Sequence, residues 1–266
     1  MSPVFDCTTP EGRQDGIAKA TAGVRLGDLV VLPTDTLYGI GADAFSPDAV
    51  QRLLDAKGRG REMPPPVLVP EIRTVDGLAT EVPAYARALI ERYWPGPLTL
   101  VFKAQPSLMW DLGDTGGTVA VRMPDHDVAL ELLKEVGPMA VSSANRTGQP
   151  ASRTVIDAAT QLGASVEFYL DGGPVTGGLA STIVDCTHPE PTILRRGAID
   201  ADEIMELANQ HLELPAEQQD VDEQPIDEHR SEQQESGEQE RTEQELEFDE
   251  HAPDQQADLK ESKSDE

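Results

Sequence analysis

The sequence contains little of several residue types, and each shortage excludes a class of protein. Cys7 and Cys186 are its only cysteines, which excludes a disulfide-stapled fold and a zinc site built from paired cysteines. Aromatic residues make up 4% of the 266 residues. Basic residues number 21 against 49 acidic ones, and the net charge of -28 gives the chain no general attraction to nucleic acid or anionic membranes.

Long apolar runs and clustered histidines are missing too. No stretch approaches the roughly 20 apolar residues that a membrane-spanning helix needs, and charged residues interrupt the first 19 positions, unlike a secretory signal peptide. His126 and His188 are the only histidines before residue 211, and neither has metal-ligand spacing to another ligand. We therefore expect a cytoplasmic protein without membrane contact and without a protein-held metal.

The negative charge is concentrated at one end of the chain. Residues 212–266 carry 21 acidic and 4 basic residues, net -17, whereas residues 1–211 carry 28 and 17, net -11. The end segment consists mainly of Glu, Gln, Asp and Ser, so it cannot bury enough apolar surface to offset its ordering entropy. The composition predicts a folded domain at 1–211 and a disordered acidic tail at 212–266.

Upstream of residue 212, helical and strand patterns alternate. Apolar spacing predicts helices at 15–27, 46–57, 83–93, 128–135, 153–162 and 202–211. Short apolar runs predict strands at 29–32, 98–102, 118–121, 139–142, 168–170, 181–184 and 192–194. This mixed alternation predicts an α/β fold with an open mixed sheet and helices packed against it.

Residues 33–44, PTDTLYGIGADA, contain a glycine pattern of low specificity. Gly39 and Gly41 match part of a dinucleotide-binding fingerprint, but that fingerprint needs its glycines at a helix N-terminus. The best helix start is Ser46, followed by Pro47 and Asp48. We therefore predict no dinucleotide site, and interpret residues 33–41 as a strand exit with two hydroxyls and flexible glycines.

Cations, hydroxyls and an amide recur where the predicted elements end. Lys57, Arg59 and Arg61 follow one helix, residues 142–145 (SSAN) follow one strand, and Arg195 ends another. Ligands of open α/β sheets bind at strand ends, and these groups suit a nucleoside triphosphate and a small polar substrate. Each cluster also has a purely structural explanation, since cations pair with helix dipoles and Ser, Thr and Asn satisfy local turns.

Seven short motifs in order resemble the YrdC/Sua5 family, the L-threonylcarbamoyladenylate synthases, over roughly residues 15–200. They are PTDTLYGIGADA (33–44), AKGRGREMP (56–64), WPGPLTLV (94–101), VAVRMP (119–124), SSANRTGQP (142–150), STIVD (181–185) and ILRRGAI (193–199). Longer members append a second folded domain. With an acidic segment in that place, this chain resembles the stand-alone catalytic form.

The resemblance implies a twisted α/β sheet with a concave ligand-binding face and a nucleotidyltransferase activity. ATP, L-threonine and bicarbonate would give threonylcarbamoyl-AMP, pyrophosphate and water, with Mg²⁺ accompanying ATP and bridging its phosphates. The product would pass to a threonylcarbamoyl transferase complex for t6A modification of tRNA at position 37, with at most weak tRNA contact by this chain. Because the substrate supplies the nucleophile, the shortage of histidine and cysteine is compatible with this chemistry.

The resemblance also implies a role for individual residues. Lys57 and Arg59 would act at the triphosphate and in catalysis. The other ATP-binding candidates are Thr118, Ser143, Asn145 and Arg195, and the threonine-binding candidates are Thr34 or Thr36, Arg122, Ser142 and Ser181. Arg122 suits the threonine carboxylate because a guanidinium can pair with it in bidentate fashion.

Two positions depart from the family pattern. Many members have a proline where this chain has Gly60, and a histidine after the following Pro-Leu, where this chain has Pro64-Pro65-Pro66 and residues 67–70, VLVP. A histidine contact to threonine is therefore missing or replaced. Arg196 stands where a proline is frequent, and we expect it to add a charge near the phosphates.

A non-catalytic RNA-binding or ribosome-maturation factor is the alternative function. Its basic patch would comprise Lys57, Arg59, Arg61, Arg122, Arg146, Arg153, Arg195 and Arg196. The acidic domain and the scarcity of aromatic residues for base stacking weigh against it. Salt-dependent RNA binding without an adenylate product would favour it.

Overall fold

The computed structural model describes residues 2–212, so the predicted acidic tail lies outside the described residues except for Leu212. In the described part, eleven strands form one sheet. They are β1 (Val4–Asp6), β2 (Val30–Leu32), β3 (Gly39–Asp43), β4 (Val67–Leu68), β5 (Ala79–Thr80), β6 (Leu98–Ala104), β7 (Thr118–Arg122), β8 (Met139–Ser143), β9 (Phe168–Asp171), β10 (Thr182–Asp185) and β11 (Thr192–Arg195). Their order is β1-β9-β2-β3-β8-β4-β7-β6-β10-β11, and β5 pairs with β6.

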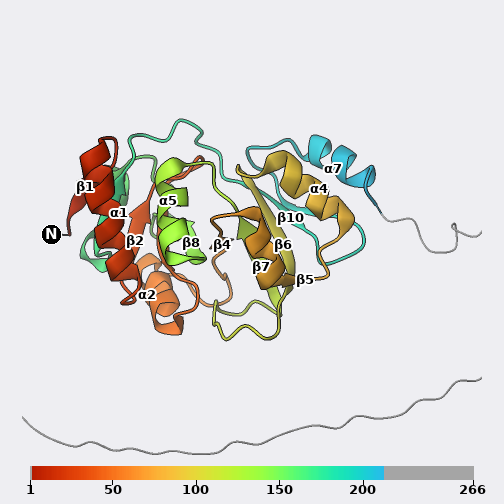
Figure 1. Cartoon of the computed structure of the whole chain (residues 1–266), viewed down its shortest axis with the longest axis horizontal. Coiled ribbons are helices and arrows are strands. Elements are labelled where there is room, and N and C mark those ends of the chain that lie inside the picture. The colour runs from red at the N-terminus through yellow and green to blue at the C-terminus, as the bar shows by residue number, and fades with distance from the viewer. Residues whose placement is uncertain (1, 213–266) are drawn as a thin grey trace, which may run out of the picture. The chain divides into compact units, whose positions relative to one another are not determined.

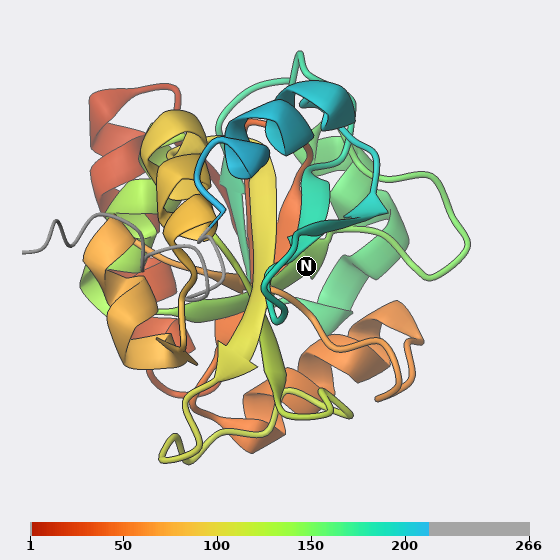
Figure 2. The same ribbon diagram turned by 90° about the vertical axis from the view of Figure 1, so that its right-hand side faces the viewer.

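The sheet is mixed, as predicted. β1 and β2 pair in parallel with β9, and β4–β7 and β6–β10 are also parallel. β3 is antiparallel to both β2 and β8, and β6 is antiparallel to β7. Figure 2 shows the strong twist of the sheet. The structure confirms the predicted open α/β architecture.

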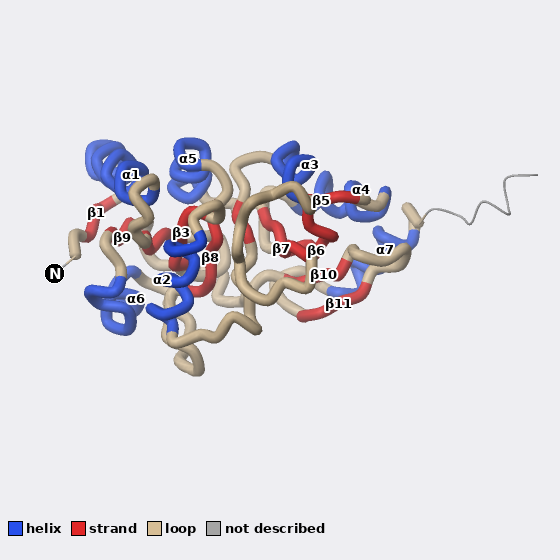
Figure 3. The backbone as a smooth tube through the Cα atoms, turned by 90° about the horizontal axis from the view of Figure 1, so that it is seen from below, coloured by secondary structure: helices blue, strands red, loops and turns tan. Residues whose placement is uncertain are grey.

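Helices cover the two faces of the sheet. They are α1 (Pro10–Val24), α2 (Pro47–Lys57), α3 (Val75–Leu78), α4 (Ala84–Tyr93), α5 (Asp127–Val136), α6 (Val155–Leu162) and α7 (Ala201–Asn209), with 3₁₀ turns at Ile72–Thr74 and Gly163–Ser165. α1 and α5 lie together on one face, and α2 and α6 lie on the other (Figure 3). α4 and α7 pack together at the end of the sheet that carries β6 and β10 (Figure 1). No helix among residues 2–212 has the length and apolar character to cross a bilayer.

Local capping explains where most helices begin. Ser46 caps α2 through Ala49 N–H with Pro47 in the first turn, and Thr154 forms a capping box with Asp157 at α6. The prediction for α1 was wrong at its start. Thr9 caps the helix, which begins at Pro10, five residues before the predicted start.

The prediction that residues 33–41 leave β2 through a flexible glycine segment was wrong at its glycines. Gly39 and Gly41 lie in β3, a buried strand that pairs with β2 and β8. A Cβ atom at Gly39 would lie 2.6 Å from Cγ1 of Val141, and one at Gly41 would lie 2.9 Å from Cε of Met139. These glycines therefore permit close packing within the sheet. Their place in a strand also agrees with the prediction that they form no dinucleotide-binding turn.

Side-chain alternation in β6 leaves one face of the central sheet open. Leu98, Leu100 and Phe102 point into the core with α4, whereas Thr99 and Val101 point to the opposite face. β7 alternates in the same way, with Val121 in the core and Arg122 on the open face. Polar groups placed on alternate strand positions thus face a cavity.

Candidate active site

A cavity of about 470 Å³ lies on the open face of the central strands. Residues from β3, β4, β6, β7, β8, β10 and β11 line it, together with the loops that follow β2 and α2. Its polar lining consists of Thr34, Thr36, Tyr38, Arg59, Thr99, Arg122, Ser142, Ser143, Ser181 and Arg195. No lining residue among those described is acidic. A domain of net negative charge therefore contains a cationic cavity, which suits an anionic ligand.

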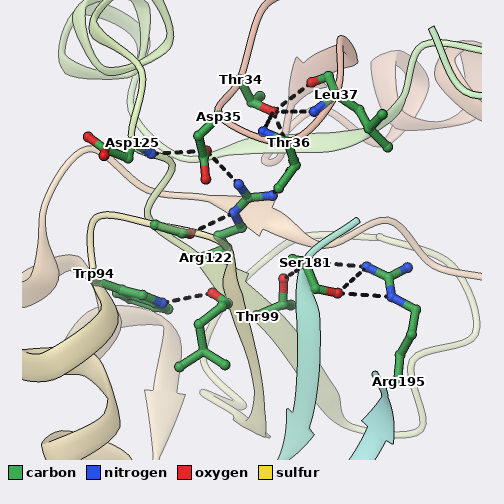
Figure 4. A network of polar contacts seen from close by, with 12 residues as sticks. Thr34, Asp35, Thr36, Leu37, Trp94, Thr99, Arg122, Asp125, Ser181 and Arg195 are labelled. Carbon is green, nitrogen blue, oxygen red and sulfur yellow. Dashed lines mark hydrogen bonds and ion pairs between the residues drawn. The ribbon is translucent and has the colours of Figure 1, made fainter. Parts of the chain in front are cut away.

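Arg122 ends β7 and is 7% exposed. Its Nε donates to the Gly96 carbonyl (2.9 Å), one terminal nitrogen donates to Thr36 Oγ1 (2.9 Å), and the other pairs with Asp35 Oδ1 (2.5 Å). Burial lowers the pKa of Arg122, and Asp35 opposes that shift. A guanidinium stays charged even so, and this one is fixed in a single orientation (Figure 4).

Thr34 and Thr36 form a hydrogen-bonded pair in the turn between β2 and β3. Their hydroxyls lie 3.1 Å apart, and Thr34 Oγ1 donates to the Leu37 carbonyl at 2.6 Å. Thr34 Oγ1 also accepts from the backbone N–H groups of Thr36 and Leu37. The Thr34 hydroxyl therefore stabilises the turn, as the purely structural alternative predicted. The Thr36 hydroxyl accepts from Arg122.

Ser181 and Arg195 meet on the opposite wall of the cavity. Arg195 donates to the carbonyl and to Oγ of Ser181 at 2.9 and 3.0 Å, and the buried Thr99 hydroxyl lies 2.8 Å from the same Oγ (Figure 4). Burial lowers the pKa of Arg195. No carboxylate of the described chain pairs with this guanidinium, so its charge is available to a ligand.

Arg59 enters the cavity from the loop after α2. One of its terminal nitrogens donates to Ser142 Oγ at 2.9 Å, and its Nε is buried without a partner. Burial lowers the pKa of Arg59, Glu62 opposes the shift, and the neighbouring charge of Arg195 adds to it. Two like charges near one cavity are stabilised by an anion that both can contact.

Lys57 and Asn145 lie behind the cavity wall. The Lys57 ammonium donates to the carbonyls of Ser143 and Asn145, the latter at 2.7 Å, and burial lowers its pKa to about 8. The Asn145 amide donates to the carbonyls of Arg146 and Gln149, whereas its Oδ1 is buried without a partner. In this structure the two side chains hold the SSAN loop, and neither lines the cavity.

Two sequence-predicted groups lie away from the cavity. Thr118 is at the other end of β7 from Arg122, and its hydroxyl donates to the Thr115 carbonyl. Its assignment to ATP stays a prediction. The expectation that Arg196 adds charge near the phosphates is not supported by the geometry, because its side chain is 73% exposed, lies 3.8 Å from Asp202 and does not line the cavity.

Prolines occupy the wall where the family histidine was expected. Pro64 and Pro66 line the cavity, with Leu68 of β4 beside them. This part of the wall is therefore apolar and offers no side-chain hydrogen bond.

Sequence reasoning missed three contributors to the site. Asp35 pairs with Arg122, Thr99 contacts Ser181, and the Gly96 carbonyl accepts from Arg122. Asp35 and Thr99 lie within quoted motifs, so their positions were visible in the sequence. The residues that they contact could not be predicted from the sequence, because the three contacts join residues 26 to 87 positions apart.

Residues 2–212 contain no group of three or more His, Cys, Asp or Glu side chains placed to hold a metal ion. The cavity lining offers hydroxyls and guanidinium groups instead. Guanidinium groups cannot ligate a metal ion, so hydroxyls are the only side-chain oxygens that the described lining offers to a cation.

Comparisons with known proteins find relatives in sequence and in fold. The Sua5/YciO/YrdC family model, described as "Telomere recombination", matches residues 23–197. A Mycobacterium leprae protein named "Putative threonylcarbamoyl-AMP synthase" is 56% identical over 207 residues, which cover 78% of this chain and 94% of the relative. The threonylcarbamoyl-AMP synthase of Bacillus subtilis is 38% identical over 190 residues, which cover 71% of this chain and 55% of the relative.

A solved structure has the same fold. P. abyssi Sua5 complexed with L-threonine superposes with a TM-score of 0.74 at 34% identity, covering 77% of this chain and 61% of that one.

Proposed function

Because the chain belongs to the Sua5/YciO/YrdC family, we propose that its cavity makes threonylcarbamoyl-AMP and pyrophosphate from ATP, L-threonine and bicarbonate. The observation that carries the proposal is the cavity wall, which combines Arg59, Arg122 and Arg195 with buried hydroxyls and no acidic side chain. Such a wall suits one ligand with a carboxylate and another with several phosphates.

The reaction needs no protein nucleophile. The threonine amine bonds to the carbon of bicarbonate and water leaves, giving a carbamate. A carbamate oxygen then attacks the α-phosphorus of ATP, and the bond to the β-phosphate oxygen breaks to release pyrophosphate. Both cysteines are buried and burial raises the pKa of each thiol, that of Cys7 to about 11, so neither is poised for nucleophilic chemistry.

Positioning and charge stabilisation are the tasks left to the chain. In the proposed arrangement Arg59 and Arg195 neutralise charge that builds on the transferring phosphate, and Arg122 holds the threonine carboxylate. Lys57, Ser143, Asn145 and Thr118 complete the ATP site, while Ser142, Ser181 and Thr34 or Thr36 complete the threonine site. Arg59 and Arg195 would hold the phosphates with which Mg²⁺ arrives, and the ion would supply neutralisation of phosphate charge.

The product belongs to the t6A modification of tRNA. We propose that this chain hands the adenylate to a threonylcarbamoyl transferase complex. The net charge of -28 disfavours a broad tRNA interface on the chain itself.

Threonine-dependent pyrophosphate release tests the function. With MgATP and bicarbonate, we expect pyrophosphate and threonylcarbamoyl-AMP, identified by mass spectrometry, only when L-threonine is present. Valine, which replaces the hydroxyl by a methyl group, is the matched control substrate. Pyrophosphate release that ignores threonine contradicts the proposal, and salt-dependent RNA binding without adenylate product favours the RNA-binding alternative.

Two adjacent arginines provide a matched pair of variants for this assay. Arg195 lines the cavity and Arg196 is exposed. We expect Arg195→Gln to lower kcat/KM on the order of 10²-fold, as loss of one preorganised donor does, and Arg196→Gln to leave it unchanged. Equal activity of the two variants would remove Arg195 from the site.

A further inference from the structure

Asp35 is the only carboxylate of the described chain that contacts the buried arginine of the cavity. Its Oδ1 lies 2.5 Å from Arg122, and the two side chains are 15% and 8% exposed. The same Oδ1 accepts the backbone N–H of Asp125 at 3.0 Å, which ties the turn after β2 to the segment between β7 and α5. Asp35 does not line the cavity, so it acts on a ligand only through Arg122.

The contacts of Arg122 leave part of its guanidinium free. A guanidinium has five N–H donors. Three of them go to Gly96, Thr36 and Asp35, one from each nitrogen. One N–H on each terminal nitrogen is left, and the internal contacts fix where these two point.

The charge of the cavity is uneven as a result. Arg122 is compensated by Asp35. Arg59 donates to the hydroxyl of Ser142, and Arg195 donates to the carbonyl and the hydroxyl of Ser181. Neither guanidinium pairs with a carboxylate among the described residues. Arg122 thus forms an ion pair, while in this part of the chain Arg59 and Arg195 have none, and the only negative charge there that acts on Arg59 is that of Glu62, outside ion-pair distance.

We propose that Asp35 is a positioning and specificity-determining residue, which aims the free N–H groups of Arg122 and balances its charge so that this subsite takes a zwitterionic amino acid rather than an inorganic anion. The inference rests on the proposed function. A buried guanidinium without its carboxylate would have to find another anion, because an unpaired buried charge is strongly unfavourable. Inorganic anions would then compete with the amino acid at Arg122.

The test compares Asp35→Asn with Asp35→Glu and with the control Asp76→Asn. Asparagine keeps the shape and removes the charge, whereas glutamate keeps the charge and moves it. Asp76 pairs with Arg87 on the surface at 3.0 Å, with both side chains 57% exposed, so its loss removes an Arg–Asp contact away from the cavity. Each protein is assayed for KM of threonine, KM of ATP, kcat and inhibition by sulfate.

We expect Asp35→Asn to raise KM for threonine at least about tenfold while KM for ATP changes less than about twofold. Sulfate should become a competitive inhibitor against threonine at concentrations that do not affect the wild type. Asp35→Glu should raise KM for threonine without new sulfate sensitivity, and Asp76→Asn should behave as the wild type. Unchanged threonine KM and sulfate sensitivity in Asp35→Asn, or an equal loss toward threonine and ATP, would overturn the proposal.

Calorimetry without ATP separates this inference from the proposed function. If the wild type binds threonine but releases no pyrophosphate, the function fails and binding of threonine and sulfate to the variants still decides the role of Asp35. If Asp35→Asn does not fold, the binding of threonine and sulfate to Asp35→Glu decides the role of Asp35. Competition between sulfate and threonine in that variant, which keeps the charge, overturns the inference.

Discussion

The four cations assigned to the site make hydrogen bonds to different chemical groups. Lys57 binds backbone carbonyls, Arg122 binds a carboxylate, and Arg59 and Arg195 bind hydroxyl and carbonyl groups of serines. A carbonyl or hydroxyl satisfies hydrogen bonds without cancelling the charge, whereas a carboxylate cancels it. The partner of each cation therefore decides how much positive charge a ligand meets.

The titration of the single residue Lys57 should make the activity depend on pH. Burial lowers its pKa to about 8, so the ammonium loses its charge as the pH rises through that value. If the charge serves the triphosphate, kcat/KM should fall above about pH 8, and Lys57→Ala should lower it on the order of 10²-fold at pH 7. A pH–rate profile of both proteins is the measurement, and an alanine variant that keeps the wild-type step near pH 8 contradicts the assignment.

Stability should respond to the same titration with the opposite sign. The folded-state pKa of Lys57 lies below its ordinary value of 10.5, so between about pH 8 and 10.5 the unfolded chain binds more protons than the folded one. The contribution of Lys57 to the free energy of unfolding therefore rises with pH across this window. The difference in the free energy of unfolding between wild type and Lys57→Ala, measured in urea between pH 7 and pH 10, should show this rise, because the opposite contributions of the buried Cys7 and Cys186 thiols are common to both proteins.

At the scale of elements, β3 brings the two sides of the cavity together. It lies between β2 and β8, so the turn that carries Thr34, Asp35 and Thr36 is connected to the strand that ends in Ser142 and Ser143. Gly39 permits the close approach of β3 to β8, because a Cβ atom at this position would lie 2.6 Å from Cγ1 of Val141. Gly39, predicted from the sequence to lie in a flexible segment, therefore allows close packing within a strand.

Gly39→Ala tests that role. The added methyl overpacks the β3–β8 contact and should lower the free energy of unfolding by about 1–3 kcal/mol. The control is Gly77→Ala in α3, where an added Cβ meets nothing within 4 Å. That change should raise the free energy of unfolding by about 0.4–1 kcal/mol. Denaturant unfolding measures both, and a neutral Gly39→Ala would show that β8 accommodates the methyl group.

At the scale of the whole molecule, net charge is a poor guide to the site. Residues 1–211 carry a net -11, yet the cavity lining has three arginines and no acid. The acidic residues lie outside the cavity lining, and one of them, Asp35, is largely buried beside Arg122. The net charge thus excluded a general nucleic-acid binder without excluding a triphosphate ligand.

Deleting residues 213–266 should leave catalysis intact. All lining residues of the cavity precede residue 212, and the deleted segment is predicted to have no core of its own. We expect kcat and both KM values within about twofold of the full chain, and a matching thermal midpoint, since no cavity contact is removed. An inactive truncated protein contradicts the prediction, and a tail of scrambled sequence would then test whether its charge alone restores activity.

From the sequence alone, seven of the eleven strands of the described chain, six of its seven helices and the reaction class were predictable, whereas β1, β3, β4, β5 and α3 were not. The cap at Ser46, the short apolar strands and the seven ordered motifs each depend on neighbouring residues, so they can be recognised along the chain. Tertiary structure alone decided that Gly39 packs in a strand and that Asp35 compensates Arg122. Those outcomes depend on groups far apart in sequence, whose burial and pairing exist only once β3, β7 and β8 have formed one sheet.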